Sequence, residues 1–201
     1  MYIVQRVLIR LVADLKALEA KWALVGGFAV AVHGEPRTTR DVDIVLALAE
    51  EAEAEAAVLG LRLRGYRDHP DGAVLERPDG RLATVRLVSP VEGESGIVVD
   101  LLFASSGLEP EIVATAKALE ILPGIMVPVV GAGYLLAMKV LAGRPKDIED
   151  IRGILEYIEP GELRLAREAL EVITERGFHR GKNLQEEFAQ FLASMRPAAL
   201  G

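Results

Sequence analysis

The stretch WALVGGFAVAVHGEPRTTRDVDIVL, residues 22–46, joins an apolar run, a glycine pair and two aspartates at the start of a second apolar run. In a β-strand, residues two positions apart point to the same face, so Asp41 and Asp43 share one face of the second run. Two carboxylates about 7 Å apart repel each other, which raises the cost of ionising both. Because a divalent cation between them removes that cost and Mg²⁺ prefers oxygen ligands, the pair predicts a metal site. The alternative is a solvated strand start with two surface acids.

A third carboxylate, Asp100, stands inside the apolar stretch GIVVDLLFA at residues 96–104. Apolar residues on both sides of an acid predict a central strand that is buried on both faces. A carboxylate there is costly unless it forms an ion pair or ligates a metal. Three interpretations therefore stay open: a metal ligand, the partner of one of the chain's arginines, and a position at the end of the strand.

The glycine pair Gly26–Gly27 ends the first apolar run, and a short helix is expected directly after it. Glycine lets a ligand approach the backbone closely, and the free N–H groups at a helix N-terminus attract phosphate. A Gly-Gly pair by itself is typical of an ordinary turn. Followed by a D-x-D pair and a later buried acid, it indicates a phosphate cradle beside a carboxylate metal site.

The composition restricts the class of protein. A chain of 201 residues is long enough to bury one sizeable core. Because 51% of its residues are hydrophobic, the composition excludes a disordered protein. The sequence has no cysteine, which excludes disulfides and thiolate metal sites. No apolar run reaches the roughly 18 residues of a membrane helix, and the first residues lack a signal-peptide pattern, so we expect a cytoplasmic protein with no membrane partner. A net charge of −7 argues against a protein that coats nucleic acid.

The first 130 residues carry a mixed α/β pattern. We expect helices at 4–20, 28–34, 49–61 and 107–119, and strands at 22–27, 41–48, 62–68, 83–89 and 97–103. Pro123-Gly124 is typical of a turn between two short strands within 120–130. Further turn signals are HPDG at 69–72, RPDG at 77–80 and EGESG at 92–96.

From Gly131 onward the pattern is helical, with expected helices at 132–142, 146–158, 161–176 and 183–194. We therefore predict an α/β (α+β) protein with two parts. Residues 1–130 would form a catalytic domain, a small mixed sheet with flanking helices, and residues 131–201 a helical C-terminal subdomain.

The three site elements, in this order, resemble the nucleotidyltransferase superfamily with the DNA polymerase β-like fold. The matching residues are Val25-Gly26-Gly27, Asp41-Val42-Asp43-Ile44 and Val98-Val99-Asp100-Leu101. The segment PRTTRDVD fits the R-x-T-x-D-h-D variant of small bacterial members (h, apolar) through Arg37 and Thr39. Many members have Gly-Ser where this chain has Gly26-Gly27, and this departure leaves the affinity for nucleotide open.

A later segment, YLLAMKVLAGRPKDIEDIRGIL at residues 134–155, resembles the AbiEii-type and related uncharacterised nucleotidyltransferases. The matching residues are Lys139, Arg144, Lys146, Asp147 and Asp150. The alternative interpretation is a helix start with Pro145 in its first turn and acids near its N-terminus. The sequence assigns no role to the last four of these residues.

The resemblance implies transfer of a nucleoside monophosphate from an NTP to a hydroxyl. Two Mg²⁺ ions would be held by Asp41, Asp43 and Asp100, with Asp100 assisting deprotonation of the acceptor. The nucleotide-binding candidates are Gly26, Gly27, Arg37, Thr39 and Lys139. The acceptor stays open between an RNA end such as that of tRNA, a protein side chain and a small molecule. The AbiEii likeness favours a toxin with a cognate antitoxin as its partner.

Two other functions compete with this one. A glycosyltransferase that holds a nucleotide-sugar through D-x-D is disfavoured, because only 40 residues precede the pair. A non-catalytic nucleotide-binding or antitoxin-type module of the same fold is disfavoured by the presence of all three carboxylates. His33, His69 and His179 have no metal-ligand spacing, and ERGFHRGKN at 175–183 is either an interhelical loop or an RNA-contacting patch.

Overall fold

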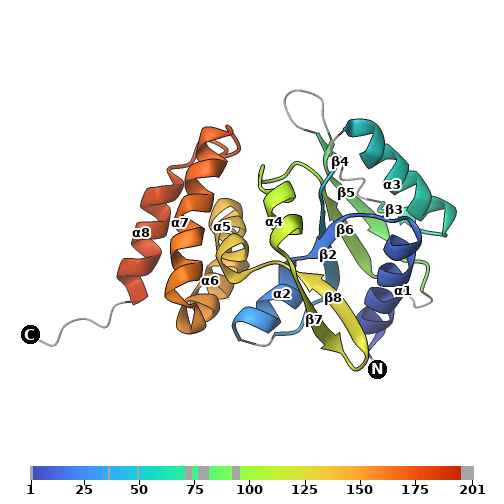
Figure 1. Cartoon of the computed structure of the whole chain (residues 1–201), viewed down its shortest axis with the longest axis horizontal. Coiled ribbons are helices and arrows are strands. Elements are labelled where there is room, and N and C mark those ends of the chain that lie inside the picture. Colours follow the sequence, from blue (N-terminus) through green and yellow to red (C-terminus); the bar gives the residue numbers. More distant parts are fainter. Residues whose placement is uncertain are drawn as a thin grey trace, which may run out of the picture. The chain divides into compact units, whose positions relative to one another are not determined.

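The computed structural model describes residues 2–35, 37–48, 50–70, 74–76, 82–91 and 96–195 (Figure 1). The turn predicted at 77–80, half of the turn predicted at 69–72 and most of the turn predicted at 92–96 lie outside the described residues. The chain forms two compact units. The first consists of Met1–Ala29, Arg37–Ser105 and Glu109–Val130, and the second of Val30–Pro36, Ser106–Leu108 and Gly131–Gly201.

The first unit is built on a mixed β-sheet. Within the described residues, eight strands pair in the order β3-β5-β6-β2-β1-β8-β7, with β4 paired to β5. Their bounds are Trp22–Leu24 (β1), Asp41–Leu46 (β2), Arg67–Asp68 (β3), Val74–Glu76 (β4), Leu82–Val88 (β5), Val98–Leu102 (β6), Lys117–Leu122 (β7) and Ile125–Val129 (β8). Strands β2 and β6 are parallel, whereas β1 and β5 run antiparallel to their neighbours β2 and β6. The two strands that carry the aspartates are therefore interior strands.

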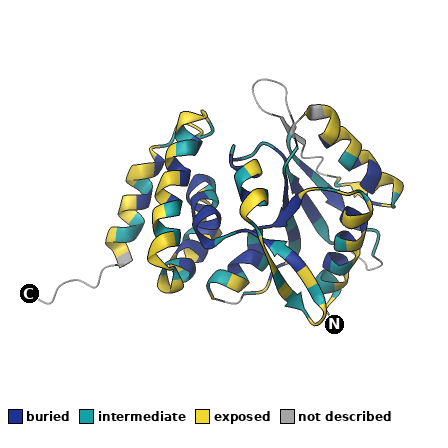
Figure 2. Cartoon of the chain, in the orientation of Figure 1, coloured by how far each residue is buried: buried dark blue, intermediate teal, exposed yellow. Residues whose placement is uncertain are grey.

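Helices cover this sheet. They are α1 (Ile3–Ala17), α3 (Glu51–Leu63) and α4 (Glu109–Thr115), and α2 (Gly26–His33) follows β1 directly. Helices α1 and α4 contact β2, and α3 contacts β5. Leu8, Leu11 and Leu15 of α1 recur at a spacing of three to four residues and are fully buried, as expected for an amphipathic helix on a sheet. Figure 2 shows the buried residues concentrated in the strands and on the inner faces of the helices.

Two predicted elements of this unit are wrong in part. Residues 62–68 do not form one strand, because α3 continues to Leu63 and only Arg67–Asp68 pair with β5. Leucine and arginine are good helix formers, so they prolong the Ala/Glu-rich helix. The helix predicted at 107–119 ends at Thr115, and Lys117–Leu122 instead pair with β8. Pairing with a distant strand here overrides local helix propensity.

The second unit is helical, as predicted. It contains α5 (Ala132–Ala142), α6 (Pro145–Tyr157), α7 (Pro160–Glu175) and α8 (Leu184–Met195). Nearly all of α5 is buried, and it packs on α7 (Figure 2). The division into two domains at residue 130 stays a prediction, since the compact units also assign residues 30–36 and 106–108 to the helical part. Among the described residues, no helix combines the length and the apolar character that crossing a bilayer requires.

The basic segment at 175–183 connects α7 and α8. The guanidinium of Arg176 donates to the carbonyl of Gly107, and Lys182 Nζ donates to the carbonyl of Leu141 at 3.0 Å, near the C-terminus of α5. Cations near a helix C-terminus satisfy its last carbonyls and its dipole. Two of the basic side chains in this segment therefore hold the helical unit together.

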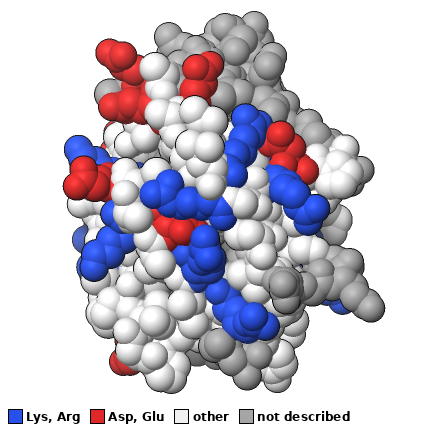
Figure 3. Space-filling model, turned by 90° about the vertical axis from the view of Figure 1, so that its right-hand side faces the viewer, with Lys and Arg blue, Asp and Glu red and all other residues white. Residues whose placement is uncertain are grey.

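A buried carboxylate joins α1 to the turn after α3. Asp14, 7% exposed, accepts hydrogen bonds from Arg10 Nε at 2.7 Å and from the Tyr66 hydroxyl at 3.2 Å. Arg64 Nε lies 3.8 Å from the same carboxylate. Figure 3 views the side of the molecule on which α1 and α3 lie in Figure 1, and Lys and Arg side chains gather there around a few acidic ones. Burial raises the pKa of Tyr66, and the charge of Asp14 raises it further.

We expect Tyr66→Phe to lower the free energy of unfolding by about 1 kcal/mol at pH 7, because the change removes one hydrogen bond to a buried carboxylate. The folded chain holds the Tyr66 proton more tightly than the unfolded chain, in which the pKa is the ordinary 10.0. The native protein should therefore lose stability as the pH rises above 10.0 towards the folded pKa, and the variant should lose less. Urea unfolding at pH 7 to 11 measures both effects, and equal alkaline slopes would contradict the expectation.

Candidate active site

Strand β2 presents its two aspartates on one face. Asp41 and Asp43 are half-buried, whereas the alternating Val42 and Ile44 have no exposed surface. The predicted alternation is therefore present: the apolar face packs into the core and the carboxylate face stays accessible.

Asp100 stands directly beside Asp43. The parallel register of β2 and β6 pairs the two residues, and it pairs Asp41 with Val98. Since neighbouring strands lie about 4.8 Å apart, the carboxylates of Asp43 and Asp100 leave adjacent points of one sheet face. Asp100 is 7% exposed, so its charge needs a partner.

That partner is Arg86, a residue that the sequence did not single out. Strands β5 and β6 pair Arg86 with Asp100, and the guanidinium donates from Nε to Oδ1 and from Nη2 to Oδ2, each at 2.8 Å. These hydrogen bonds raise the pKa of Arg86, burial opposes them, and the charges of Asp100, Asp43 and Asp41 add to the rise. One of the three interpretations of Asp100, a pair with an arginine, is thus realised in the structure. The available signal was an arginine inside the apolar strand LATVRLV.

The glycine pair is required by the side chains that cover it. Gly26 has a φ of +61°, and a Cβ built on it would overlap the Asp43 carboxylate. A Cβ on Gly27 would collide with the Thr39 hydroxyl and would lie 3.3 Å from Arg37 Nη1. The turn between β1 and α2 therefore brings together Asp43, Thr39 and Arg37, three of the predicted site residues.

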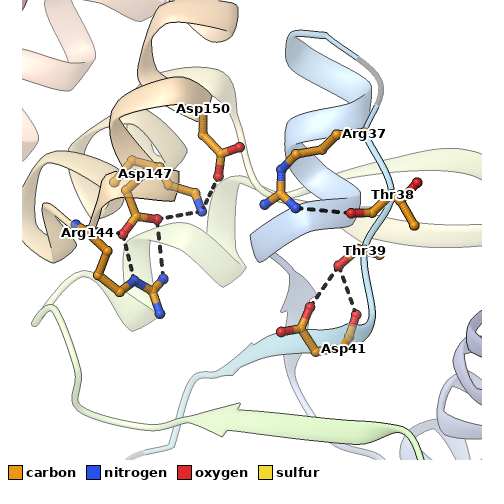
Figure 4. A network of polar contacts seen from close by, with 8 residues as sticks. Arg37, Thr38, Thr39, Asp41, Arg144, Asp147 and Asp150 are labelled. Atoms are coloured by element: carbon orange, nitrogen blue, oxygen red, sulfur yellow. Dashed lines mark hydrogen bonds and ion pairs between the residues drawn. The ribbon is translucent and has the colours of Figure 1, made fainter.

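Thr39 places its hydroxyl where a side chain at position 27 would stand. Its side chain is buried, and its Oγ1 donates to Asp41 Oδ1 at 2.8 Å (Figure 4). Arg37 Nη1 donates to the carbonyl of Thr38 at 3.4 Å in the same segment. The R-x-T segment thus folds over the glycine turn and supplies a hydroxyl beside Gly27, which itself has none.

Lys139 lies in the second unit, in a cluster of buried charges. Its Nζ is 2.9 Å from Asp147 Oδ1 and 2.7 Å from Asp150 Oδ2, and Arg144 Nε donates to Asp147 Oδ2 at 2.7 Å (Figure 4). Burial raises the pKa of Asp147, but the hydrogen bonds from Arg144 and Lys139 outweigh it and hold that pKa below its usual range. Pro145 is the first residue of α6, so the segment is also the helix start that the alternative interpretation described. Lys146 is exposed.

The three carboxylates of the first unit suit a hard cation, since they offer only oxygen ligands from one sheet face. Within the residues that the structure describes, however, no group of three or more Asp, Glu or His side chains is arranged so that it could hold a metal ion. In this arrangement, the bidentate bond from Arg86 engages both oxygens of Asp100. A divalent ion held by all three carboxylates would require this bond to open.

Two solved structures of nucleotidyltransferase-type proteins are similar in fold to this chain. One is an antigenic nucleotidyltransferase-like protein from Paracoccidioides brasiliensis, with a TM-score of 0.54 and 21% identity over 92% of this chain and 85% of that chain. Another is a lincosamide antibiotic adenylyltransferase with lincomycin bound, with a TM-score of 0.50 and 16% identity over 76% of this chain and 97% of that chain. These likenesses confirm the predicted nucleotidyltransferase fold. No curated protein matches the sequence.

The sequence matches the family described as "Nucleotidyl transferase AbiEii toxin, Type IV TA system" over residues 8–199. The chain therefore belongs to the AbiEii nucleotidyl transferase family. The resemblance inferred from the glycine pair, the D-x-D pair and the later segment is confirmed, and the match includes residues of both compact units.

We expect Gly27→Ser to destabilise the protein by about 1–3 kcal/mol, because the new side chain overlaps the Thr39 hydroxyl. In the double variant with Thr39→Ala, part of this loss should be recovered, since the hydroxyl is removed while the Cβ of residue 39 stays 2.8 Å from a Cβ at position 27. Gly161→Ser is the matched control, because a Cβ there meets only Arg164 Nη2 at 3.9 Å. Thermal unfolding of Gly27→Ser, Thr39→Ala, the double variant and Gly161→Ser measures the coupling, and strictly additive losses would show that the two side chains do not compete.

Asp147→Asn should lower the free energy of unfolding by about 3 kcal/mol, since it replaces the carboxylate that pairs with the buried Lys139 by a neutral amide. Because the folded pKa of Asp147 lies below the ordinary 3.8, its stabilisation is present above pH 3.8 and is lost as the pH falls through the folded value. The variant should therefore lose less stability than the native protein between pH 5 and 2. Lys146→Gln, an exposed change in the same helical turn, should leave both the free energy of unfolding and its dependence on pH unchanged.

Proposed function

We propose that this chain transfers a nucleoside monophosphate from an NTP to a hydroxyl acceptor. One observation carries the proposal: Asp43 and Asp100 leave adjacent points of one sheet face, and Asp43 lies directly over the glycine turn that begins α2. Family membership supports nucleotidyl transfer in general. The NTP, the acceptor and the metal belong to the proposal.

Asp41, Asp43 and Asp100 are assigned to hold Mg²⁺. Bound there, two Mg²⁺ ions would neutralise the phosphates and lower the pKa of the acceptor hydroxyl. Among the chain's own residues, Thr39 orients Asp41 through its 2.8 Å hydrogen bond. Asp100 is the candidate to accept the proton of the attacking hydroxyl, because it is the most buried carboxylate of the three.

The glycine turn is assigned to the phosphates. The N–H groups of Gly26 and Gly27 stand at the start of α2, where the helix dipole favours an anion. Arg37, close to Gly27, adds positive charge there. Lys139 is assigned to the triphosphate on the sequence resemblance alone, and this role requires its ammonium to leave at least one of its two carboxylates.

The family description supports a cellular role as the toxin of a type IV toxin–antitoxin pair, and hence a cognate antitoxin. The acceptor that we place first is an RNA 3′ end such as that of tRNA. Protein side chains and small molecules are the other acceptors to test.

A second candidate function is a nucleotide-binding module without turnover. It is favoured by one observation, the engagement of both Asp100 oxygens by Arg86. Binding of Mg²⁺·NTP without transfer to any acceptor would distinguish this function from the first.

The test is incubation with Mg²⁺ and each α-³²P-labelled NTP, with total tRNA and cell lysate as acceptors. We expect label on one acceptor class, and a loss of about 10²–10⁴-fold in rate for Asp100→Asn, which removes the proposed base. Asp43→Asn should abolish transfer, because it removes a proposed metal ligand. Asp68→Asn, on an exposed strand, is the control and should keep full activity. Transfer that survives in Asp43→Asn would contradict the assignment.

A further inference from the structure

Arg86 lies in a row of charges that crosses three neighbouring strands. Asp43 on β2 pairs with Asp100 on β6, and Asp100 pairs with Arg86 on β5. Paired residues of adjacent strands share a sheet face, so the guanidinium projects from the same face as the carboxylates. The charges of Asp43 and Asp41 also raise the pKa of Arg86, so its positive charge is felt at all three acids.

This row offsets a repulsion that the site would otherwise carry. Asp43 and Asp100 stand side by side on neighbouring strands, where like charges repel. Two parallel hydrogen bonds of 2.8 Å from Arg86 place a positive charge on Asp100. A guanidinium has the fork geometry that satisfies both oxygens of a carboxylate at once. The same oxygens are the ones that a metal ion needs.

The ion pair is placed where it can open. The Arg86 side chain is 39% exposed, whereas that of Asp100 is 10% exposed. A partly exposed arginine loses little free energy when it exchanges a carboxylate for water, and another cation can then pair with Asp100. A divalent ion that replaces the guanidinium brings two positive charges in place of one, so the carboxylates keep a counter-charge after the exchange.

We propose that Arg86 serves as a built-in counter-ion that holds Asp100 in the metal-free protein and excludes a cation from it until the substrates arrive. Arg86 is then a positioning residue that acts through Asp100. The Asp100 position opens to a divalent ion only when the guanidinium leaves. The proposal rests on the proposed function, because it takes Asp100 to be a metal ligand.

The test is a titration of the full chain with Mn²⁺ alone, followed by the electron paramagnetic resonance signal of the free ion. We expect Arg86→Gln to bind at least one more Mn²⁺ ion than the native protein, or to bind Mn²⁺ at least tenfold more tightly. Arg67→Gln, the same change at an exposed position of the neighbouring strand β3, should bind as the native protein does. In the double variant Arg86→Gln/Asp100→Asn the added binding should disappear.

A second readout separates this role from simple packing. Metal-free Arg86→Gln should unfold at a lower temperature than the native protein, because its carboxylates repel, and Mn²⁺ should raise that temperature more than it does in the native protein. If Arg86→Gln does not fold, Arg86→Lys retains the charge without the fork and should show a smaller change of the same sign.

Equal Mn²⁺ binding by Arg86→Gln and the native protein, with nucleotide transfer intact in the native protein, would overturn this inference and leave the proposed function standing. Absence of Mn²⁺ binding in both proteins, together with absence of transfer, would overturn both. Weaker binding in Arg86→Gln would show that Arg86 supports the metal site and does not compete for it.

Discussion

The repulsion between two negative charges on adjacent strands is the constraint on which the rest of the first unit depends. Asp43 and Asp100 are paired in register in the interior of the sheet, where like charges are costly. Two neighbouring residues accommodate these charges. Arg86 binds Asp100 with two hydrogen bonds. Gly26 has no side chain, so the Asp43 carboxylate can lie against the backbone there. The apolar faces of the same strands are buried in the core, and the core supplies the rigidity that keeps the acids side by side.

The helical unit handles buried charge differently. There Lys139 and Arg144 share the carboxylates of Asp147 and Asp150, so opposite charges balance within a single cluster. Asp147 also accepts from the backbone N–H of Arg144 at 3.1 Å, which ties the cluster to the start of α6. Such a cluster is strongly destabilised by removal of one member. Its role in holding α5 to α6 is therefore distinct from any role of Lys139 towards a nucleotide.

Much of the first unit could be predicted from local patterns. Alternation identified β2 and the shared face of Asp41 and Asp43, and the order of the glycine pair and the acids indicated the fold that the solved structures confirm. What failed depends on long-range pairing. Residues 117–119 are strand because β8 pairs with them. Arg86 was missed because its place inside the apolar strand LATVRLV does not by itself reveal that this strand pairs with β6 and sets the arginine opposite Asp100. Likewise, the spacing of Lys139 and Asp147 does not reveal that both are buried.

The contact between Gly27 and Thr39 constrains how such a sequence can change over generations. One space beside the turn admits one hydroxyl-bearing side chain, and here it comes from Thr39. A lineage that placed serine at position 27 first would carry two groups in that space, and one that lost the threonine first would carry none. Either order of single steps therefore passes through an intermediate with two groups in that space or with none. Positions 27 and 39, twelve residues apart in the chain, should therefore change together.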